Sequence, residues 1–147
     1  MDNKRSTAND APISSRYPLD PLADVFDQLL GESGCPWDRK QTHKSLKPYM
    51  LEEAAEAAEA IEQGNMGQLK EELGDVLLQV VFHSALASRR GDFDLNDVIA
   101  GVTDKLIRRH PHVFGDAKAE NDEEVAELWY KIKAEEKAAQ KAASNNP

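Results

Sequence analysis

The chain has 147 residues, of which 40% are hydrophobic and one is cysteine, and its formal net charge is −9. These values fit one domain with a modest core, and they exclude a wholly disordered chain, an intramolecular disulfide and a Cys-rich zinc site. An acidic surface repels nucleic-acid backbones and anionic membranes, so neither class of partner is expected.

The chain is expected to contain a leader, a helical domain and a short tail. Residues 1–17 are polar and lack periodicity, which predicts a mobile N-terminal leader. They also lack the apolar run of a signal peptide, and no apolar stretch is long enough to span a bilayer, so a cytoplasmic location is expected. The domain is expected over residues 18–137, and residues 138–147, rich in Ala and Lys, are expected to fray.

The first predicted helix begins at Asp20-Pro21, with Asp20 as the N-cap and Pro21 as the first helical residue. Apolar residues follow at helical spacing, and Gly31 ends the segment. Residues 31–47 are predicted to form a loop or a short irregular helix.

The second predicted helix opens at Pro48 and runs to about Gln63, with Gly64 as the C′ residue. Its two sides differ in polarity, which predicts that one of them faces the core. The apolar side carries Leu51, Ala54, Ala55, Ala58 and Ile61, and the other side carries Glu52, Glu53, Glu56 and Glu59.

The third predicted helix, over about residues 66–90, is apolar on nearly every side, which predicts burial on several sides. One polar strip remains, formed by Glu72, Asp75, Gln79 and His83 at steps of three, four and four residues. Buried polar groups are costly unless they are satisfied, so this strip needs a functional reason. Gly74, between the two acids, fits close approach of another backbone or a ligand.

Two further helices complete the predicted domain. The fourth begins at Asp94 and ends before Pro111, residues 110–116 form a loop, and the fifth helix starts near Asn121 or Asp122. No β-alternation of useful length is present. The sequence therefore predicts an all-α fold of about five helices, built on a helical hairpin.

Two acidic pairs lie on the hairpin. Glu53 and Glu56 are three residues apart, as are Glu72 and Asp75, so each pair falls on roughly one side of its helix. Two carboxylates about 5 Å apart repel by about 3 kcal/mol at an effective dielectric of 20, so four of them converge only around a compensating cation. Oxygen ligands favour a hard ion, and Mg²⁺ is the usual one where phosphates bind. The alternative interpretation is a solvated acidic face.

Two other groups of residues admit both a structural and a functional interpretation. Lys105, Arg108 and Arg109 either complement the dipole at the end of the fourth helix or clamp a polyphosphate. Trp37 either plugs the core or stacks on a nucleobase.

Several motifs occur together in one order and spacing: Gly34-Cys35-Pro36-Trp37-Asp38, Gln41-Thr42, Leu51-Glu52-Glu53, Glu71-Glu72-Leu73-Gly74-Asp75, Asp104-Lys105-Leu106 and Arg109-His110-Pro111-His112-Val113-Phe114-Gly115. In these motifs the chain resembles the MazG family of all-α nucleoside triphosphate pyrophosphohydrolases, from about Pro21 to Lys137. Many members carry two tandem copies of the domain, and this single copy is most similar to the first.

The resemblance implies a chemistry for the acidic pairs. Glu53, Glu56, Glu72 and Asp75 match the Glu-x-x-Glu and Glu-x-x-Asp pattern of the family. They would be the catalytic, metal-binding residues that hold Mg²⁺, with Mn²⁺ as a substitute. The reaction would hydrolyse nucleoside triphosphates to monophosphate and pyrophosphate, as a house-cleaning activity on the nucleotide pool.

The resemblance also implies partners for the remaining residues. Lys105, Arg108 and Arg109 match the basic segment near the phosphates, and Trp37 lies in the loop expected near the nucleotide. Members form homodimers or larger homo-oligomers in which helices of two protomers build one bundle. The alternative from another class is a non-catalytic helical module that dimerises and senses nucleotides.

Overall fold

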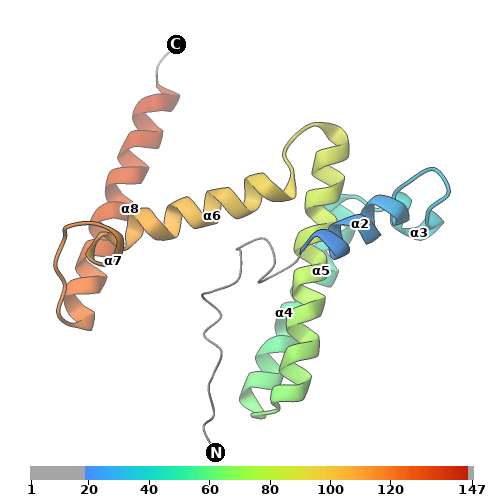
Figure 1. Cartoon of the computed structure of the whole chain (residues 1–147), viewed down its shortest axis with the longest axis horizontal. Helices are drawn as coiled ribbons and strands as arrows, with labels where there is room; N and C mark the ends of the chain where they lie inside the picture. The colour runs from blue at the N-terminus through green and yellow to red at the C-terminus, as the bar shows by residue number, and fades with distance from the viewer. Residues whose placement is uncertain (1–18, 146–147) are drawn as a thin grey trace, which may run out of the picture. The chain divides into compact units, whose positions relative to one another are not determined.

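The computed structural model describes residues 19–145, so the expected leader, residues 1–17, lies outside the described part. The described chain contains helices and no strand, which confirms the all-α prediction (Figure 1). The helices are α2 (Asp20–Leu29), α3 (Pro36–Arg39), α4 (His43–Glu62), α5 (Met66–Arg90), α6 (Leu95–Arg109), α7 (Pro111–Phe114) and α8 (Asp122–Ser144). The short helices α3 and α7 bring the number in this part of the chain to seven, above the predicted five.

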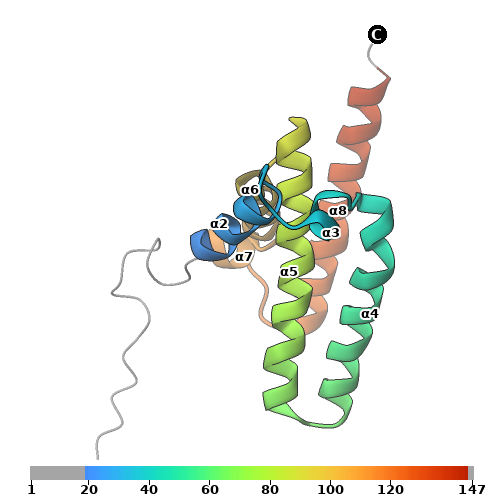
Figure 2. The ribbon, with the colours of Figure 1, turned by 90° about the vertical axis from the view of Figure 1, so that its right-hand side faces the viewer.

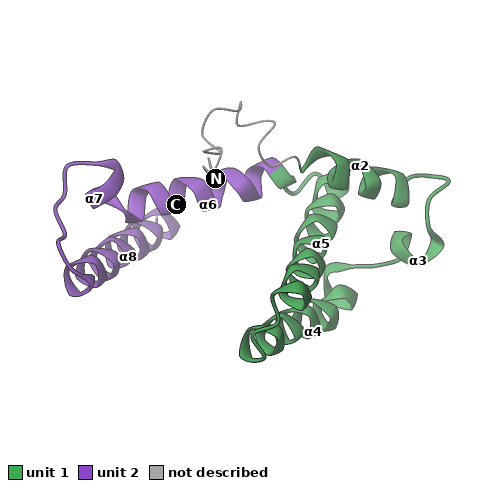
Figure 3. Cartoon of the chain, turned by 60° about the horizontal axis from the view of Figure 1, so that its bottom comes forward, with its two compact units in different colours: residues 1–95 green, residues 96–147 purple. Residues whose placement is uncertain are grey.

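The chain divides into two compact units, residues 1–95 and residues 96–147 (Figure 3). The core of the first unit consists of Phe26, Leu30, Leu46, Val81 and Phe82, which are contributed by α2, α4, α5 and the residue that follows α2. The rings of Phe26 and Phe82 lie 4.9 Å apart between centroids, so α2 packs directly on α5. Burial of one such side chain contributes about 1.5–3 kcal/mol.

Helix α4 begins five residues earlier than predicted, at His43 instead of Pro48. Thr42 Oγ1 accepts a hydrogen bond from the Ser45 backbone N–H at 3.0 Å, and Ser45 Oγ accepts one from the Thr42 N–H at 2.8 Å. This reciprocal capping box satisfies the free N–H groups at the helix start. Pro48 therefore lies inside the helix, in its second turn, where it cannot donate the backbone hydrogen bond to the carbonyl of Lys44.

Helices α4 and α5 form the predicted antiparallel hairpin (Figure 2). Gly64 has a φ of 65°, the left-handed conformation expected at the residue that ends a helix. Asn65 then caps α5, because its Oδ1 accepts a hydrogen bond from the Gln68 N–H at 3.0 Å. The predicted turn and the predicted span of α5 are both confirmed.

The polarity of α4 is the reverse of the prediction. Ala57 and Ala60 are buried and Glu53 is half-buried, whereas Leu51 is 64% exposed. The side predicted to face the core, with Leu51, Ala54, Ala55, Ala58 and Ile61, is exposed in the described chain. The small side chains of Ala57 and Ala60 pack toward α5, and Glu53 and Glu56 turn inward with them, while Glu52 and Glu59 stay exposed.

The same reversal occurs on α5, which we predicted to be buried on several sides. Glu72 and Gln79 are buried, while Leu73 is 54% exposed. A Cβ atom added at Gly74 would meet nothing within 4 Å in the described chain beyond the backbone of its own helix, so the expected close approach is not made there. Glu72 and Gln79 of the polar strip thus face inward while Asp75 is exposed, and Leu73 and Leu77 face outward.

The second unit contains α7, α8 and all of α6 except its first residue. Helix α6 ends at Arg109, as predicted, but the predicted loop over residues 110–116 contains α7, with Pro111 as its first residue. Asn121 Oδ1 caps α8 by accepting from the Glu124 N–H at 2.9 Å, and this helix continues to Ser144.

Several apolar residues of α6 are exposed: Ile99, Val102 and Leu106. Among the described residues of the second unit, none is fully buried. Within residues 19–145, no helix combines the length and the apolar character needed to cross a membrane.

Candidate functional site

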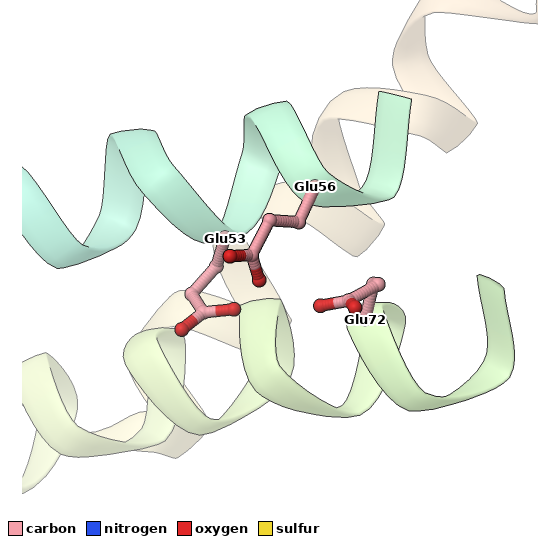
Figure 4. A group of neighbouring side chains, drawn as sticks. All are labelled: Glu53, Glu56 and Glu72. Atoms are coloured by element: carbon pink, nitrogen blue, oxygen red, sulfur yellow. The ribbon is translucent and has the colours of Figure 1, made fainter. Parts of the chain in front are cut away.

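Three carboxylates converge between α4 and α5. Glu53 and Glu56 project from α4 and Glu72 from α5, and all three side chains point into the space between the helices (Figure 4). One oxygen from each lies within 4.8 Å of the others. The structure therefore brings together three of the four predicted acids. Asp75 is exposed and is not a member of this group.

We call Glu53, Glu56 and Glu72 the acidic cluster. Two carboxylate oxygens of the acidic cluster are buried and lack any hydrogen-bond partner. They are Oε2 of Glu53 and Oε2 of Glu72, and Glu72 is only 7% exposed. A buried carboxylate oxygen without a partner is costly, and a cation would satisfy it. Because the donors are all carboxylate oxygens, a hard ion such as Mg²⁺ or Mn²⁺ fits the set.

The pKa values of two glutamates in the acidic cluster are raised. A hydrogen bond with Glu72 and the charge of Glu72 raise the pKa of Glu56 from 4.5 to about 7. Burial, followed by the charge of Asp75, also raises the pKa of Glu53. Asp75 thus lies close enough to act on the cluster electrostatically. A divalent cation would take the place of a proton on Glu56.

A polar cavity of about 320 Å³ adjoins the acidic cluster on the side of the hairpin turn. Two glutamine side chains line it and bond to carboxylates: Gln63 Nε2 donates to Glu59 Oε1 at 3.1 Å, and Gln68 Nε2 donates to Glu72 Oε1. This volume lies at the lower end of the range for small-molecule sites. Neither glutamine was identified from the sequence, although the four-residue spacing of Gln68 and Glu72 places them on one side of α5.

The predicted basic residues lie near the end of α6, and two of them share a carboxylate. Arg108 Nε lies 2.5 Å from Glu136 Oε1, and Arg109 Nη2 lies 2.9 Å from Glu136 Oε2. The hydrogen bond from Arg109, followed by the one from Arg108, lowers the pKa of Glu136 to about 2. Lys105 is exposed. Glu136 was not identified from the sequence, because no local spacing connects it with α6.

Arg109 also stacks on an aromatic ring. Its Cζ lies 4.9 Å from the ring centroid of Trp129 on α8. A guanidinium over an indole face is an attractive arrangement, so Trp129 helps to fix the position of Arg109. Together Glu136 and Trp129 hold this arginine in a defined place.

Trp37 lies on the surface in helix α3 and does not plug the core. It is 44% exposed, and its ring contacts that of Tyr49 edge-to-face with 5.9 Å between centroids. Its backbone carbonyl accepts a hydrogen bond from Gln41 Nε2 at 2.8 Å, which ties α3 to the start of α4. An exposed indole face supported by a second ring is suited to stacking, and Tyr49 was not identified from the sequence.

Comparison with known proteins identifies a family. Residues 41–114 match the profile of the MazG nucleotide pyrophosphohydrolase domain. A solved crystal structure of a MazG-related protein from Thermotoga maritima superposes with a TM-score of 0.65 and 29% sequence identity. The superposition covers 78% of this chain and 97% of that one.

Similar curated proteins are longer than this chain. A nucleoside triphosphate pyrophosphohydrolase/pyrophosphatase MazG from Thermotoga maritima is 51% identical over 125 residues, which are 85% of this chain and 48% of that protein. A nucleoside triphosphate pyrophosphohydrolase from Escherichia coli K12 is 49% identical over 121 residues, which are 82% of this chain and 46% of that protein. The chain thus spans about half the length of the curated relatives that it matches.

Proposed function

Since this chain belongs to the MazG nucleotide pyrophosphohydrolase family, we propose that it hydrolyses nucleoside triphosphates to nucleoside monophosphates and pyrophosphate. One observation carries the proposal: two buried carboxylate oxygens, Glu53 Oε2 and Glu72 Oε2, have no partner and belong to a three-carboxylate cluster. This arrangement is unfavourable for a packing interface and favourable for a divalent cation. The relatives whose names carry the activity are about twice as long, so the activity of this chain needs its own test.

We propose that the acidic cluster holds Mg²⁺, with Mn²⁺ as a substitute, and that Asp75 completes the ligand set by a change of side-chain conformation. Such an ion, when bound, neutralises phosphate charge and lowers the pKa of a bound water. Glu56 would give up its proton to become a ligand. Glu72, which is almost fully buried, would anchor the α5 side of the site.

The remaining predicted residues would bind the nucleotide. Arg108 and Arg109 supply forked donors suited to phosphate oxygens, and Lys105 supplies a point charge. Arg108 and Arg109 now contact Glu136, so a phosphate would displace the carboxylate of Glu136. The exposed face of Trp37 would stack on the base, an interaction that every nucleobase permits.

A homodimer, in which helices of two protomers form one bundle, is part of the proposal. The outward leucines Leu73 and Leu77 on α5, and Leu51 on α4, support it, because a hairpin that exposes large apolar residues on both helices needs a covering surface. A second copy of the same hairpin offers a self-complementary one. The proposed setting is the cytoplasm, where the activity would clear the nucleotide pool.

The test is to measure pyrophosphate release from a panel of nucleoside triphosphates with Mg²⁺. Glu72→Ala should lower the rate by more than about 100-fold, since outer-shell residues of metal sites alone account for 10- to 100-fold. Glu71→Ala is the matched control, because Glu71 is the adjacent, exposed glutamate of α5 and should leave the rate unchanged. Full activity in Glu72→Ala would refute the assigned role.

The product assay, combined with a binding measurement, distinguishes the enzyme from the alternative, a non-catalytic nucleotide-sensing module. Isothermal calorimetry that detects nucleotide binding, combined with the absence of any product, would favour the sensor. Release of inorganic phosphate and a nucleoside diphosphate would instead indicate cleavage at a different phosphate bond.

A further inference from the structure

Gln68 lies in the first turn of α5, and its side chain points toward the acidic cluster. Its Nε2 donates a hydrogen bond to Oε1 of Glu72. The other oxygen of the same carboxylate, Oε2, is buried without a partner. The glutamine amide therefore occupies one oxygen of Glu72 and leaves the other available to a cation.

From its position in the sequence, the Gln68 side chain could complete the N-terminal cap of α5, but in the structure it does not. Asn65 and Gln68 have the spacing of a capping box, in which the side chain at the third helical position bonds back to the N–H of the N-cap residue. Here the Asn65 N–H donates instead to the carbonyl of Ala60 at 3.1 Å, at the end of α4. Asn65 Oδ1 still accepts from the Gln68 N–H, so the cap is complete without the Gln68 side chain.

Because the cap does not need the Gln68 amide, that amide is available to orient Glu72. A carboxylate with one oxygen fixed by a neutral donor loses less conformational freedom when a metal binds to the other oxygen. Gln63 provides a comparison in the same cavity: its amide also bonds to a glutamate four residues away, but that residue is Glu59, which lies outside the acidic cluster.

We infer that Gln68 is a positioning residue for the metal site: it fixes Glu72 so that its Oε2 faces the space shared with Glu53 and Glu56. The inference rests on the proposed function, since it assumes that the acidic cluster binds a divalent cation. It assigns to Gln68 an effect on metal affinity and no direct contact with the metal or with the substrate.

The test compares Gln68→Met with the matched control Gln63→Met, by isothermal calorimetry with Mn²⁺ or Mg²⁺ in the absence of nucleotide. Methionine keeps the length and helix propensity of glutamine but removes the amide donor. Gln68→Met should weaken metal binding by about 10- to 100-fold, the range for lost outer-shell partners, and Gln63→Met should match wild type. Gln68→Asn, which shortens the side chain by one methylene and moves the amide away from Glu72, should weaken metal binding as well.

A second readout separates positioning from a general structural effect. The Mg²⁺ concentration that gives half-maximal pyrophosphate release should rise in Gln68→Met by the same factor as the metal dissociation constant. The rate at saturating Mg²⁺ should return close to the wild-type value. The metal-free Gln68→Met protein should unfold at a slightly lower temperature than wild type, because Glu72 Oε1 loses its donor, and both it and Gln63→Met should remain folded at the assay temperature.

The outcomes distinguish this inference from the function on which it rests. Wild-type protein that binds neither Mn²⁺ nor Mg²⁺ would refute the proposed metal site itself. Wild-type binding that persists unchanged in Gln68→Met would overturn the role of Gln68 and leave the metal site intact. Equal weakening in Gln68→Met and Gln63→Met would also overturn it, since the effect would then be general to the cavity.

Discussion

The Nδ1 atoms of His43 and His83 lie 2.7 Å apart, and the planes of the two rings are only 6° from parallel. A hydrogen bond between two imidazole nitrogens requires one ring to donate and the other to accept, so two fully protonated rings cannot maintain it. Nε2 of His83 is buried and has no partner. The pair joins the first residue of α4 to α5, on the same polar strip that carries Glu72 and Gln79.

The histidine pair should make the fold sensitive to acid. Burial, and then the charge of His43, lower the pKa of His83 below its usual 6.5. Between the lowered pKa and 6.5 the unfolded chain binds a proton that the folded chain does not, so the contribution to stability is complete above about pH 6.5 and is lost as the pH falls. Urea unfolding followed by circular dichroism should show this decline, and His83→Gln should flatten it. An unchanged slope in His83→Gln would contradict the assignment.

Metal binding should release a proton from the acidic cluster. The pKa of Glu56 is raised from 4.5 to about 7, so the metal-free protein holds a proton there below about pH 7, and its stabilising effect is lost as the pH rises through that value. A metal ligand must be deprotonated. Calorimetry of Mn²⁺ binding in buffers of different ionisation enthalpy should therefore detect release of about one proton at pH 6, falling toward zero by about pH 8.5. Glu56→Gln should remove most of the release, and release that is independent of pH would contradict the prediction.

Glu136 should compete with phosphate for Arg108 and Arg109. Glu136→Gln removes the negative charge that both guanidiniums contact, so affinity for inorganic tripolyphosphate should rise by about 3-fold, as suits a partly exposed ion pair. Glu135→Gln is the matched control, because this neighbouring acid on α8 is exposed. Weaker binding of tripolyphosphate to Glu136→Gln would instead mean that Glu136 holds the arginines in their binding positions.

Loss of the pair with Glu136 should also appear in acid unfolding. The pKa of Glu136 is lowered to about 2, so its contribution to stability is present above about pH 4.5 and disappears as the pH falls toward 2. Glu136→Gln should remove that part of the acid sensitivity and lower the stability near neutral pH. A wild-type unfolding profile between pH 2 and 5 in Glu136→Gln would show that the ion pair contributes little in solution.

The outward leucines of α5 should control the oligomeric state. Replacing Leu73 and Leu77 together with Glu places two charges on the proposed dimer surface, where burying them would be strongly unfavourable. Sedimentation velocity should show a dimer for wild type and a monomer for Leu73→Glu/Leu77→Glu. The same charge introduced at exposed Val113 on α7, outside this surface, should leave the dimer intact. A monomeric wild type would refute the proposed interface.

The hairpin was predictable because its determinants are local. Asn65 and Gly91 bound α5 on either side, and Gly64 takes the left-handed conformation that the sequence suggested. The start of α4 was not predicted, because Pro48 gave a strong but false signal, whereas the actual cap depends on the side chains of Thr42 and Ser45. The sequence thus contains two local signals for the start of α4, Pro48 and the Thr42–Ser45 capping box, and the helix begins at the capping box.

Three of the four predicted acids converge, and helix geometry explains why the fourth, Asp75, does not. Glu72 and Gln79 are seven residues apart, which is about 20° of rotation, and both are buried. Asp75 is about 60° away from Glu72 around the helix, and it is exposed. The ion pairs of Glu136 join residues 27 and 28 positions apart, so they depend on how α8 packs against α6 and could not be read from spacing.

The turn at Gly64 lets one short length of chain supply the whole acidic cluster. Glu53, Glu56 and Glu72 all precede Arg90, and the loop that closes between Glu56 and Glu72 is short. Closing a short loop is fast and costs little entropy compared with pairing distant segments. Every carboxylate of the cluster is therefore synthesised before α8, so the hairpin that carries the cluster can close without the C-terminal helix.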